Sequence, residues 1–90
     1  MITIGCDIGK KSLDVFINGK HHKFDNQKEG ICKFIEECKK HEVARIVLEP
    51  TGGYERNLLK ELHNNKLPIS VVHPSFVRNF AKVHAHGMRL

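Results

Sequence analysis

Two acidic residues, Asp7 and Glu49, follow apolar segments that are typical of buried β-strands. Asp7 comes after ITIGC at residues 2–6, and Glu49 comes after IVL at residues 46–48. If these strands are parallel neighbours, both carboxylates emerge at the same carboxyl edge, where open α/β sheets place their sites. Pro50 favours this placement of Glu49, because the residue before a proline is pushed toward extended geometry. The spacing therefore predicts a pair of adjacent carboxylates at one edge of a sheet.

Two adjacent carboxylates are suited to holding a divalent metal ion. They repel each other unless they share a proton or a cation, and Mg²⁺ or Mn²⁺ takes carboxylate oxygens while leaving positions for phosphate and water. We therefore expect Asp7 and Glu49 to be metal ligands and catalytic residues, with Mg²⁺ or Mn²⁺ as the cofactor. Either acid alone is explained more simply as a solvated residue at a strand end, so it is their combination that favours a site.

Residues suited to phosphate contact lie next to both acids in the sequence. Lys10 and Lys11 occupy the turn after Asp7. Residues 51–53, Thr-Gly-Gly, form a compact turn that lets the backbone approach a phosphate, and the helix after it offers unpaired N–H groups. The alternative is a plain strand-to-helix turn capped by Thr51. The residues expected to contact nucleic acid are Lys10, Lys11, Thr51, Gly52, Gly53, Arg56, Arg78, Lys82 and Arg89.

The positive charge of the chain is concentrated in its last part. The formal net charge is +5, and residues 50–90 carry six basic residues against Glu55 and Glu61. Arg78 and Lys82 are four residues apart, so they share one face of an expected helix. This asymmetry favours a polyanionic partner bound through phosphate contacts rather than base readout. An ordinary solvated basic surface accounts for the charge equally well.

Apolar periodicity and turn residues predict the elements that position these side chains. Residues 18–19, Asn-Gly, are a strong hairpin signal, since both tolerate positive φ. Asn26, with Glu29 three residues later, resembles a capping box at the start of an amphipathic helix. Tyr54 is expected to be a core ring on the inward face of a later helix, with a stacking platform for nucleic acid as the alternative. The expected elements are strands over residues 2–8, 12–18 and 21–24, a helix after residue 26, a strand over 44–49, a helix over 54–64, a strand over 69–72, and a last helix from residue 74.

This order of elements predicts one α/β domain over residues 1–90. A three-stranded antiparallel meander is followed by alternating helices and strands, which gives a mixed sheet with helices on both faces and with the first and fourth strands parallel and adjacent. The arrangement is the ribonuclease H-like architecture. The chain is expected to be truncated before the last catalytic helix of that architecture.

Composition narrows the class and the compartment. The chain is 40% apolar and 28% charged, as in globular domains. No apolar run approaches the roughly 20 residues that span a membrane, and the N-terminus leads directly into a strand rather than a signal segment. A cytoplasmic location without a membrane partner is therefore expected. The three cysteines lack metal-like spacing and are expected to be reduced and packed.

Three segments resemble the motifs of a known family. GCDIGK at residues 5–10, followed by LDV, is similar to the opening G-I-D-V-S-K-x-x-L-D-V. EPTGGYE at 49–55 is similar to E-x-T-G-x-Y-E, and PISVVHP at 68–74, followed by VRNFA, is similar to P-V-x-V-V-N-P-x-x-V-R-x-F-A. These motifs belong to the DEDD transposases of bacterial insertion sequences, whose catalytic fold is similar to that of Holliday-junction resolvases.

The resemblance implies a Mg²⁺-dependent enzyme that processes DNA strands, with Asp7 and Glu49 as the first two of four acidic ligands. The remaining acids of the family come in a K-T-D-x-x-D-A segment shortly after the last expected helix, and a further domain carries a nucleophilic serine. The 90 residues are therefore expected to be an N-terminal part of the catalytic domain, inactive alone. DNA is the implied partner, and the family is compatible with a guide RNA and with homo-oligomers.

Two other functions stay open on the residues. One is a non-catalytic domain that binds nucleic acid or another protein, which the basic surface would also serve. The other is an ATP-binding domain of the actin-like and sugar-kinase type, because Gly5, Asp7 and Gly9 before a hairpin also open those proteins. Such enzymes need a second nucleotide-binding domain, for which 90 residues leave no room.

Overall fold

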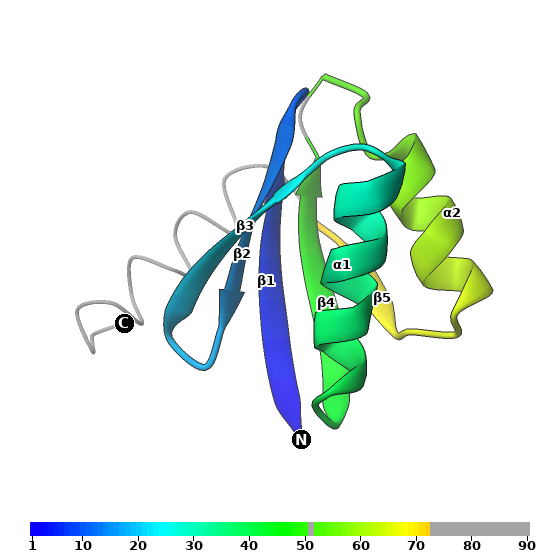
Figure 1. Ribbon diagram of the computed structural model, residues 1–90. Helices are drawn as coiled ribbons and strands as arrows, with labels where there is room; N and C mark the ends of the chain where they lie inside the picture. The colour runs from blue at the N-terminus through cyan, green and yellow to red at the C-terminus, as the bar shows by residue number, and fades with distance from the viewer. Residues whose placement is uncertain (51, 73–90) are drawn as a thin grey trace.

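The computed structural model describes residues 1–50 and 52–72, which form a five-stranded sheet and two helices (Figure 1). The predictions for Thr51, Arg78, Lys82 and Arg89, and the helix predicted from residue 74, fall outside the described residues. The elements are β1 (Ile2–Ile8), β2 (Ser12–Ile17), β3 (Lys20–Asp25), α1 (Lys28–Lys39), β4 (Val43–Pro50), α2 (Arg56–Asn64) and β5 (Ile69–Val71).

The sheet is mixed, with the strand order β3-β2-β1-β4-β5. β1 pairs antiparallel with β2, and β2 pairs antiparallel with β3, so the first three strands form the predicted meander. β1 pairs parallel with β4, and β4 pairs parallel with β5. The predicted α/β sheet, with the first and fourth strands parallel and adjacent, is confirmed, and it is compatible with a ribonuclease H-like fold.

The hairpin between β2 and β3 turns at Asn18 and Gly19, whose φ angles are 50° and 79°. Positive φ at both central residues gives a two-residue turn whose twist matches that of the flanking strands. The Asn-Gly signal in the sequence is thus confirmed.

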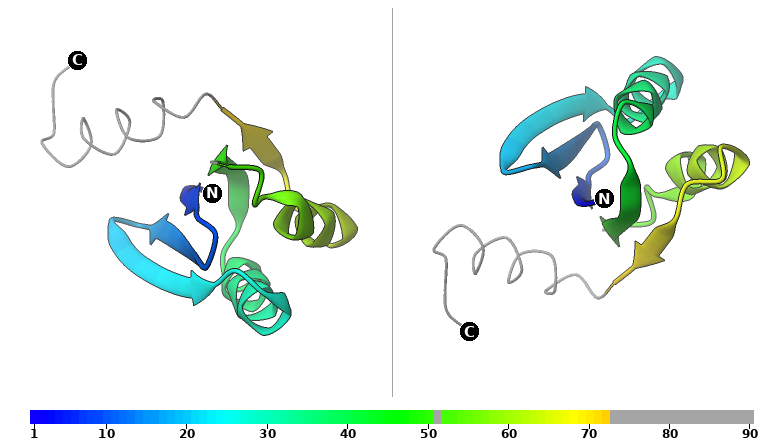
Figure 2. Two further views of the ribbon diagram at one scale, coloured as in Figure 1. Left: turned by 90° about the horizontal axis from the view of Figure 1, so that it is seen from above. Right: turned by 90° about the horizontal axis from the view of Figure 1, so that it is seen from below.

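Both described helices pack against the same face of the sheet (Figures 1 and 2). Strand side chains alternate between the two faces, so every second residue of β1, β2 and the end of β4 points beneath the helices. Neither helix of the described part is long and apolar enough to cross a membrane. The core residues under the helices are Ile4, Cys6, Ile8, Leu13, Val15, Ile17, Ile31, Phe34, Ile35, Cys38, Ile46, Leu48, Leu58 and Leu62.

Two helix starts differ from the sequence-based expectation. α1 is preceded by Gln27 as its N-cap, with no side-chain capping bond, so the predicted capping box at Asn26 is wrong. The Asn26 side chain instead donates to backbone carbonyls of two distant segments. α2 begins at Arg56, because residues 52–55 form turns that include two glycines with positive φ.

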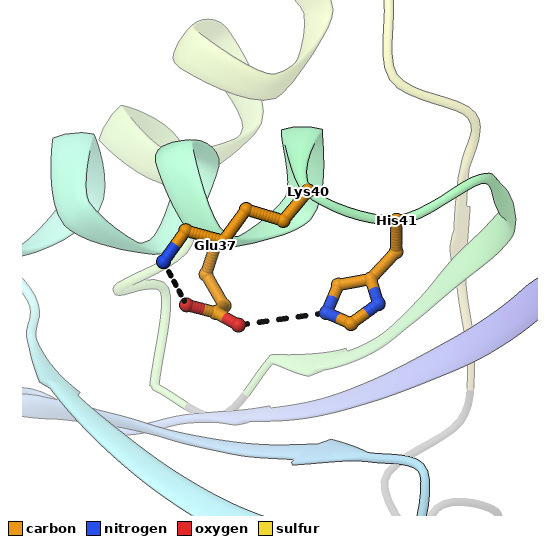
Figure 3. A network of polar contacts seen from close by, with 3 residues as sticks. All are labelled: Glu37, Lys40 and His41. Atoms are coloured by element: carbon orange, nitrogen blue, oxygen red, sulfur yellow. Dashed lines mark hydrogen bonds and ion pairs between the residues drawn. The ribbon is translucent and has the colours of Figure 1, made fainter.

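The last turn of α1 carries a small polar network (Figure 3). Glu37 accepts from Lys40 at 3.3 Å through Oε1, and its Oε2 lies 3.4 Å from the His41 ring nitrogen Nε2. The hydrogen bond from Lys40 is the main reason why the pKa of Glu37 lies below its usual range. A cation in the last turn also interacts favourably with the helix dipole, so this network stabilises the end of α1.

The three cysteines are free but unequally exposed. Cys6 and Cys38 belong to the core, whereas Cys32 is exposed on α1, so the expectation that all three are packed is wrong for Cys32. Burial, with a further contribution from Asp7, raises the pKa of the Cys6 thiol far above its usual range. Burial, with a contribution from Glu37, raises the pKa of Cys38 to about 12.

Alkylation of the native chain should therefore modify Cys32 and spare Cys6 and Cys38, because the thiolate is the reacting form and the two core thiols are both buried and protonated. Iodoacetamide treatment at neutral pH followed by mass spectrometry should find one modified cysteine in the native chain and all three in denaturant. Rapid native modification of Cys6 or Cys38 would contradict the packing described here.

The Glu37 network should make a small, pH-dependent contribution to stability. Because the folded-state pKa of Glu37 is below the ordinary value of 4.5, the contribution is present above that pH and is lost as the pH falls through the folded-state pKa. Glu37→Gln should lower the denaturation midpoint at neutral pH and leave it unchanged in strong acid. Glu36→Gln, at an exposed position of the same helix, is the control; an equal effect of Glu37→Gln at every pH would count against the network.

Candidate active site

Asp7 and Glu49 are direct partners in the parallel pairing of β1 with β4. Neighbouring strands lie about 4.8 Å apart, and residues in register on them point to the same face of the sheet. The pairing thus brings together the two acids that the sequence separates by more than forty positions. The predicted adjacency of Asp7 and Glu49 at the carboxyl edge of β1 and β4 agrees with this register.

The two acids lie on the face of the sheet opposite α1 and α2. Cys6 and Leu48, the residues before them, are completely buried beneath the helices, and the strand alternation turns Asp7 and Glu49 the other way. Asp7 is partly exposed, whereas the Glu49 side chain is completely buried. Among the described residues, Glu49 is the one charged side chain that is completely buried, which sets it apart from an ordinary solvated strand end.

A third acid, Asp14, lies beside the pair. Asp14 on β2 is the antiparallel partner of Asp7, so Asp14, Asp7 and Glu49 follow one another across three neighbouring strands. The Asp14 carboxylate lies 2.9 Å from Nε2 of His21 on β3, and both side chains are substantially exposed. Asp14 follows a turn in the sequence, and the register of the β1–β2 hairpin brings it back to the level of Asp7.

The acid pair offers part of a site for a hard divalent cation. Carboxylate oxygens are the ligands that Mg²⁺ and Mn²⁺ prefer, and two such groups in register suit them. Within residues 1–50 and 52–72, no group of three or more His, Cys, Asp or Glu side chains is arranged to hold a metal ion. Asp7 and Glu49 have the donor chemistry that such an ion prefers, and their role as metal ligands stays a prediction.

A cavity of about 320 Å³ lies at the same edge of the sheet, between the β1–β2 turn and the segment that leads into α2. Two cationic side chains line it, Lys10 from the turn and Arg56 from the first turn of α2. None of the lining residues is acidic, so the cavity favours an anion. The full lining is Lys10, Asn26, Gly53, Tyr54, Arg56 and Asn57.

The loop from β4 to α2 contains two backbone positions whose conformation favours glycine. Gly52 and Gly53 have φ angles of 72° and 78°, in the left-handed region that strains other residues. A side chain at Gly52 would also meet the Tyr54 ring, since a Cβ there would stand 2.6 Å from its Cε2 atom. The two glycines therefore let the loop fold back compactly beside the cavity.

Of the residues predicted to contact nucleic acid, Lys10, Gly53 and Arg56 come together around the cavity. Lys11 is exposed in the same turn as Lys10, and Gly52 is exposed in the same loop as Gly53. These positions lie in one region of the structure, in agreement with their grouping from the sequence. Their contact with nucleic acid stays a prediction.

Sequence reasoning missed Asn26, Tyr54 and Asn57 as part of this region. Tyr54 is not a core ring, because it is 42% exposed and lies before the start of α2. Its position after two glycines was the signal that the helix had not yet begun. Asn26 was assigned to a local cap, and no local pattern reveals a side chain that bonds to residues 17 and 28 positions away.

Comparison with known proteins adds the family. A search of curated proteins finds no match to this chain. A family model described as a transposase, of the IS110 type with the DEDD signature, matches residues 4–88, which is nearly the whole chain and includes both acids and every residue that lines the cavity. The chain therefore belongs to the IS110-type DEDD transposase family.

Proposed function

We propose that this chain is the N-terminal part of a transposase catalytic domain in which Asp7 and Glu49 bind a divalent cation for the cleavage and joining of DNA. The observation that carries the proposal is the direct register of Asp7 with Glu49 across two parallel strands. Membership of a transposase family supports DNA as the partner and favours this function over an actin-like or sugar-kinase type ATPase.

The two acids would serve as oxygen ligands for Mg²⁺ or Mn²⁺. The cation, when bound, would polarise a phosphodiester oxygen and lower the pKa of a bound water. The chain's own part is to hold two carboxylates at a fixed spacing on rigid strands. Glu49 is buried and Asp7 is partly exposed, so the pair has one side in the protein and one side toward a substrate.

The cavity at the same edge of the sheet as the acids would hold the DNA backbone. Lys10 and Arg56 bring two positive charges from separate segments to one hollow, and Gly53 allows close approach of the main chain. Contacts of this kind position a nucleic acid without reading its bases. They would also accept an RNA backbone, so a guide RNA is compatible with the same surface.

The described residues do not supply the carboxylates that two-metal phosphodiester chemistry requires, because such sites hold ions roughly 3.5–4 Å apart between several acids. Asp14 is near Asp7 but is bonded to His21. We therefore propose that the chain by itself is inactive. Non-catalytic binding of nucleic acid by this chain is the second candidate, and the basic cavity favours it.

The chain should bind Mn²⁺ weakly, at about the millimolar level expected for a site with few protein ligands, and should not cleave duplex DNA. Asp7→Asn and Glu49→Gln should each abolish the Mn²⁺ binding, measured by calorimetry, and should leave the fold intact or slightly stabilised because the repulsion between two carboxylates is removed. Glu36→Gln, an exposed acid on α1, is the matched control and should change nothing.

Two results would overturn this assignment of the metal ligands. One is Mn²⁺ binding that survives both substitutions at Asp7 and Glu49. The other is Mg²⁺-dependent cleavage by the purified chain that also survives them, which would mean that the catalytic acids lie elsewhere.

DNA binding by the chain should weaken steeply with salt and depend little on sequence. For roughly three neutralised phosphates, the log–log slope of affinity against salt should be about −2 to −3, and Lys10→Ala or Arg56→Ala should each reduce its magnitude by about 1. Lys39→Ala removes the same charge from an exposed position at the end of α1 and should have less effect on the slope. Equal slopes for all three variants would exclude the cavity as the contact surface.

A further inference from the structure

Asn26 joins the two segments that flank the acid pair. Its side-chain nitrogen Nδ2 donates to the carbonyl of Gly9 at 2.8 Å and to the carbonyl of Tyr54 at 3.0 Å. Its backbone N–H donates to the carbonyl of Lys11 at 2.9 Å. One residue therefore holds the β1–β2 turn on one side and the loop before α2 on the other.

The chemistry of these bonds determines which atom of Asn26 makes them. Both side-chain partners are backbone carbonyls, which accept hydrogen bonds and cannot donate them. The amide nitrogen, with two N–H groups, must therefore face them, and both of its donors are used. Aspartate has the same shape and no donor, so it would oppose a carboxylate to two carbonyls; alanine would leave both carbonyls without this partner.

The positions of the two carbonyls connect Asn26 to the site. Gly9 lies two residues after Asp7, and Tyr54 lies five residues after Glu49. Asn26 also lines the cavity between Lys10 and Arg56. Lys10 directly follows Gly9, and Arg56 lies two residues after Tyr54, at the start of α2. No backbone hydrogen bond between these two segments occurs in the described residues outside the sheet pairing of β1 with β4.

We propose that Asn26 is a positioning residue, which sets the spacing between Lys10 and Arg56 so that both reach the backbone of one nucleic acid. This inference rests on the proposed function, because it names the residue that organises the phosphate-binding cavity. Asn26 touches neither the cation nor the reacting atoms in this account. It acts by holding the two loops together beyond the end of the β1–β4 pairing.

The test measures a charge-dependent quantity after a substitution that removes no charge. Asn26→Ala should lower the magnitude of the log–log salt slope for binding of a short fluorescein-labelled DNA duplex by about 1, and weaken binding at low salt roughly five- to tenfold, because one cation no longer reaches a phosphate. Asn65→Ala is the control, since Asn65 donates a comparable bond to the Glu61 carbonyl at the far end of α2 and should leave slope and affinity unchanged.

A second measurement separates positioning from stability. In the wild-type chain Lys10→Ala and Arg56→Ala should each weaken DNA binding, whereas in the Asn26→Ala background one of the two should add little, because Asn26→Ala has already removed that contact. A merely structural Asn26 would leave the effects of both substitutions intact in the folded protein. Should Asn26→Ala fail to fold, Asn26→Asp takes its place, because it keeps the shape of the side chain and removes both donors. Its salt slope is then compared with that of Asn65→Asp, which adds the same charge elsewhere.

The outcomes distinguish this inference from the proposed function. Salt-dependent binding by the wild-type chain, with an unchanged slope in Asn26→Ala and full effects of both Lys10→Ala and Arg56→Ala in that background, would overturn the role of Asn26 and leave the proposed function standing. An absence of salt-dependent DNA binding by the wild-type chain would overturn both.

Discussion

The parallel pairing of β1 with β4 in one particular register is the constraint on which the rest of the site depends. At the start of the pair Ile2 is opposite Val43, but Thr3 is opposite Arg45, so Ala44 is an extra residue on β4. Without this one-residue shift, Asp7 would be opposite Leu48 rather than Glu49. Side chains alternate along a strand, so such a slip would also turn the acidic end of β4 toward the opposite face. The irregularity at the beginning of the strand thus determines the geometry at its end.

The hydrophobic core holds that register in place. Ile4 with Ile46 and Cys6 with Leu48 are completely buried partners beneath α1 and α2, and a slip by one residue would turn β4's buried side chains away from the helices. Burying one such side chain is worth about 1.5–3 kcal/mol, which exceeds a typical net hydrogen bond of about 1 kcal/mol. The packing of one face of the sheet against the helices therefore determines the position of the acids on the other face. The loops beyond the strands lack this core, and there the contacts of Asn26 become important.

The sequence predicted the structure correctly where the physical signal is local or repeats along the chain. Alternation along β2, the Asn-Gly turn, and the apolar stripe of α1 predicted their elements, and the uninterrupted apolar run that ends at Glu49 predicted β4. The adjacency of Asp7 and Glu49 followed from topology, because a strand after a meander and a helix pairs parallel with the first strand. Contacts between segments that are distant in the sequence could not be predicted. Asn26 satisfied a local capping pattern and was assigned to it, Tyr54 fitted a helical stripe that begins two residues later, and Asp14 lies beside Asp7 through a hairpin register that spacing alone does not specify.

The proposed cation site joins Asp7 and Glu49 at the carboxyl edge of β1 and β4. Paramagnetic line broadening by Mn²⁺ in the amide spectrum of the isotope-labelled chain can locate the ion, because the effect falls off steeply with distance from it. We expect that substoichiometric Mn²⁺ broadens the signals of Asp7, Ile8 and Glu49 first, and that Asp7→Asn removes this selectivity. Broadening centred instead on Glu37 and His41 at the end of α1, or persisting at the sheet edge in Asp7→Asn, would contradict it.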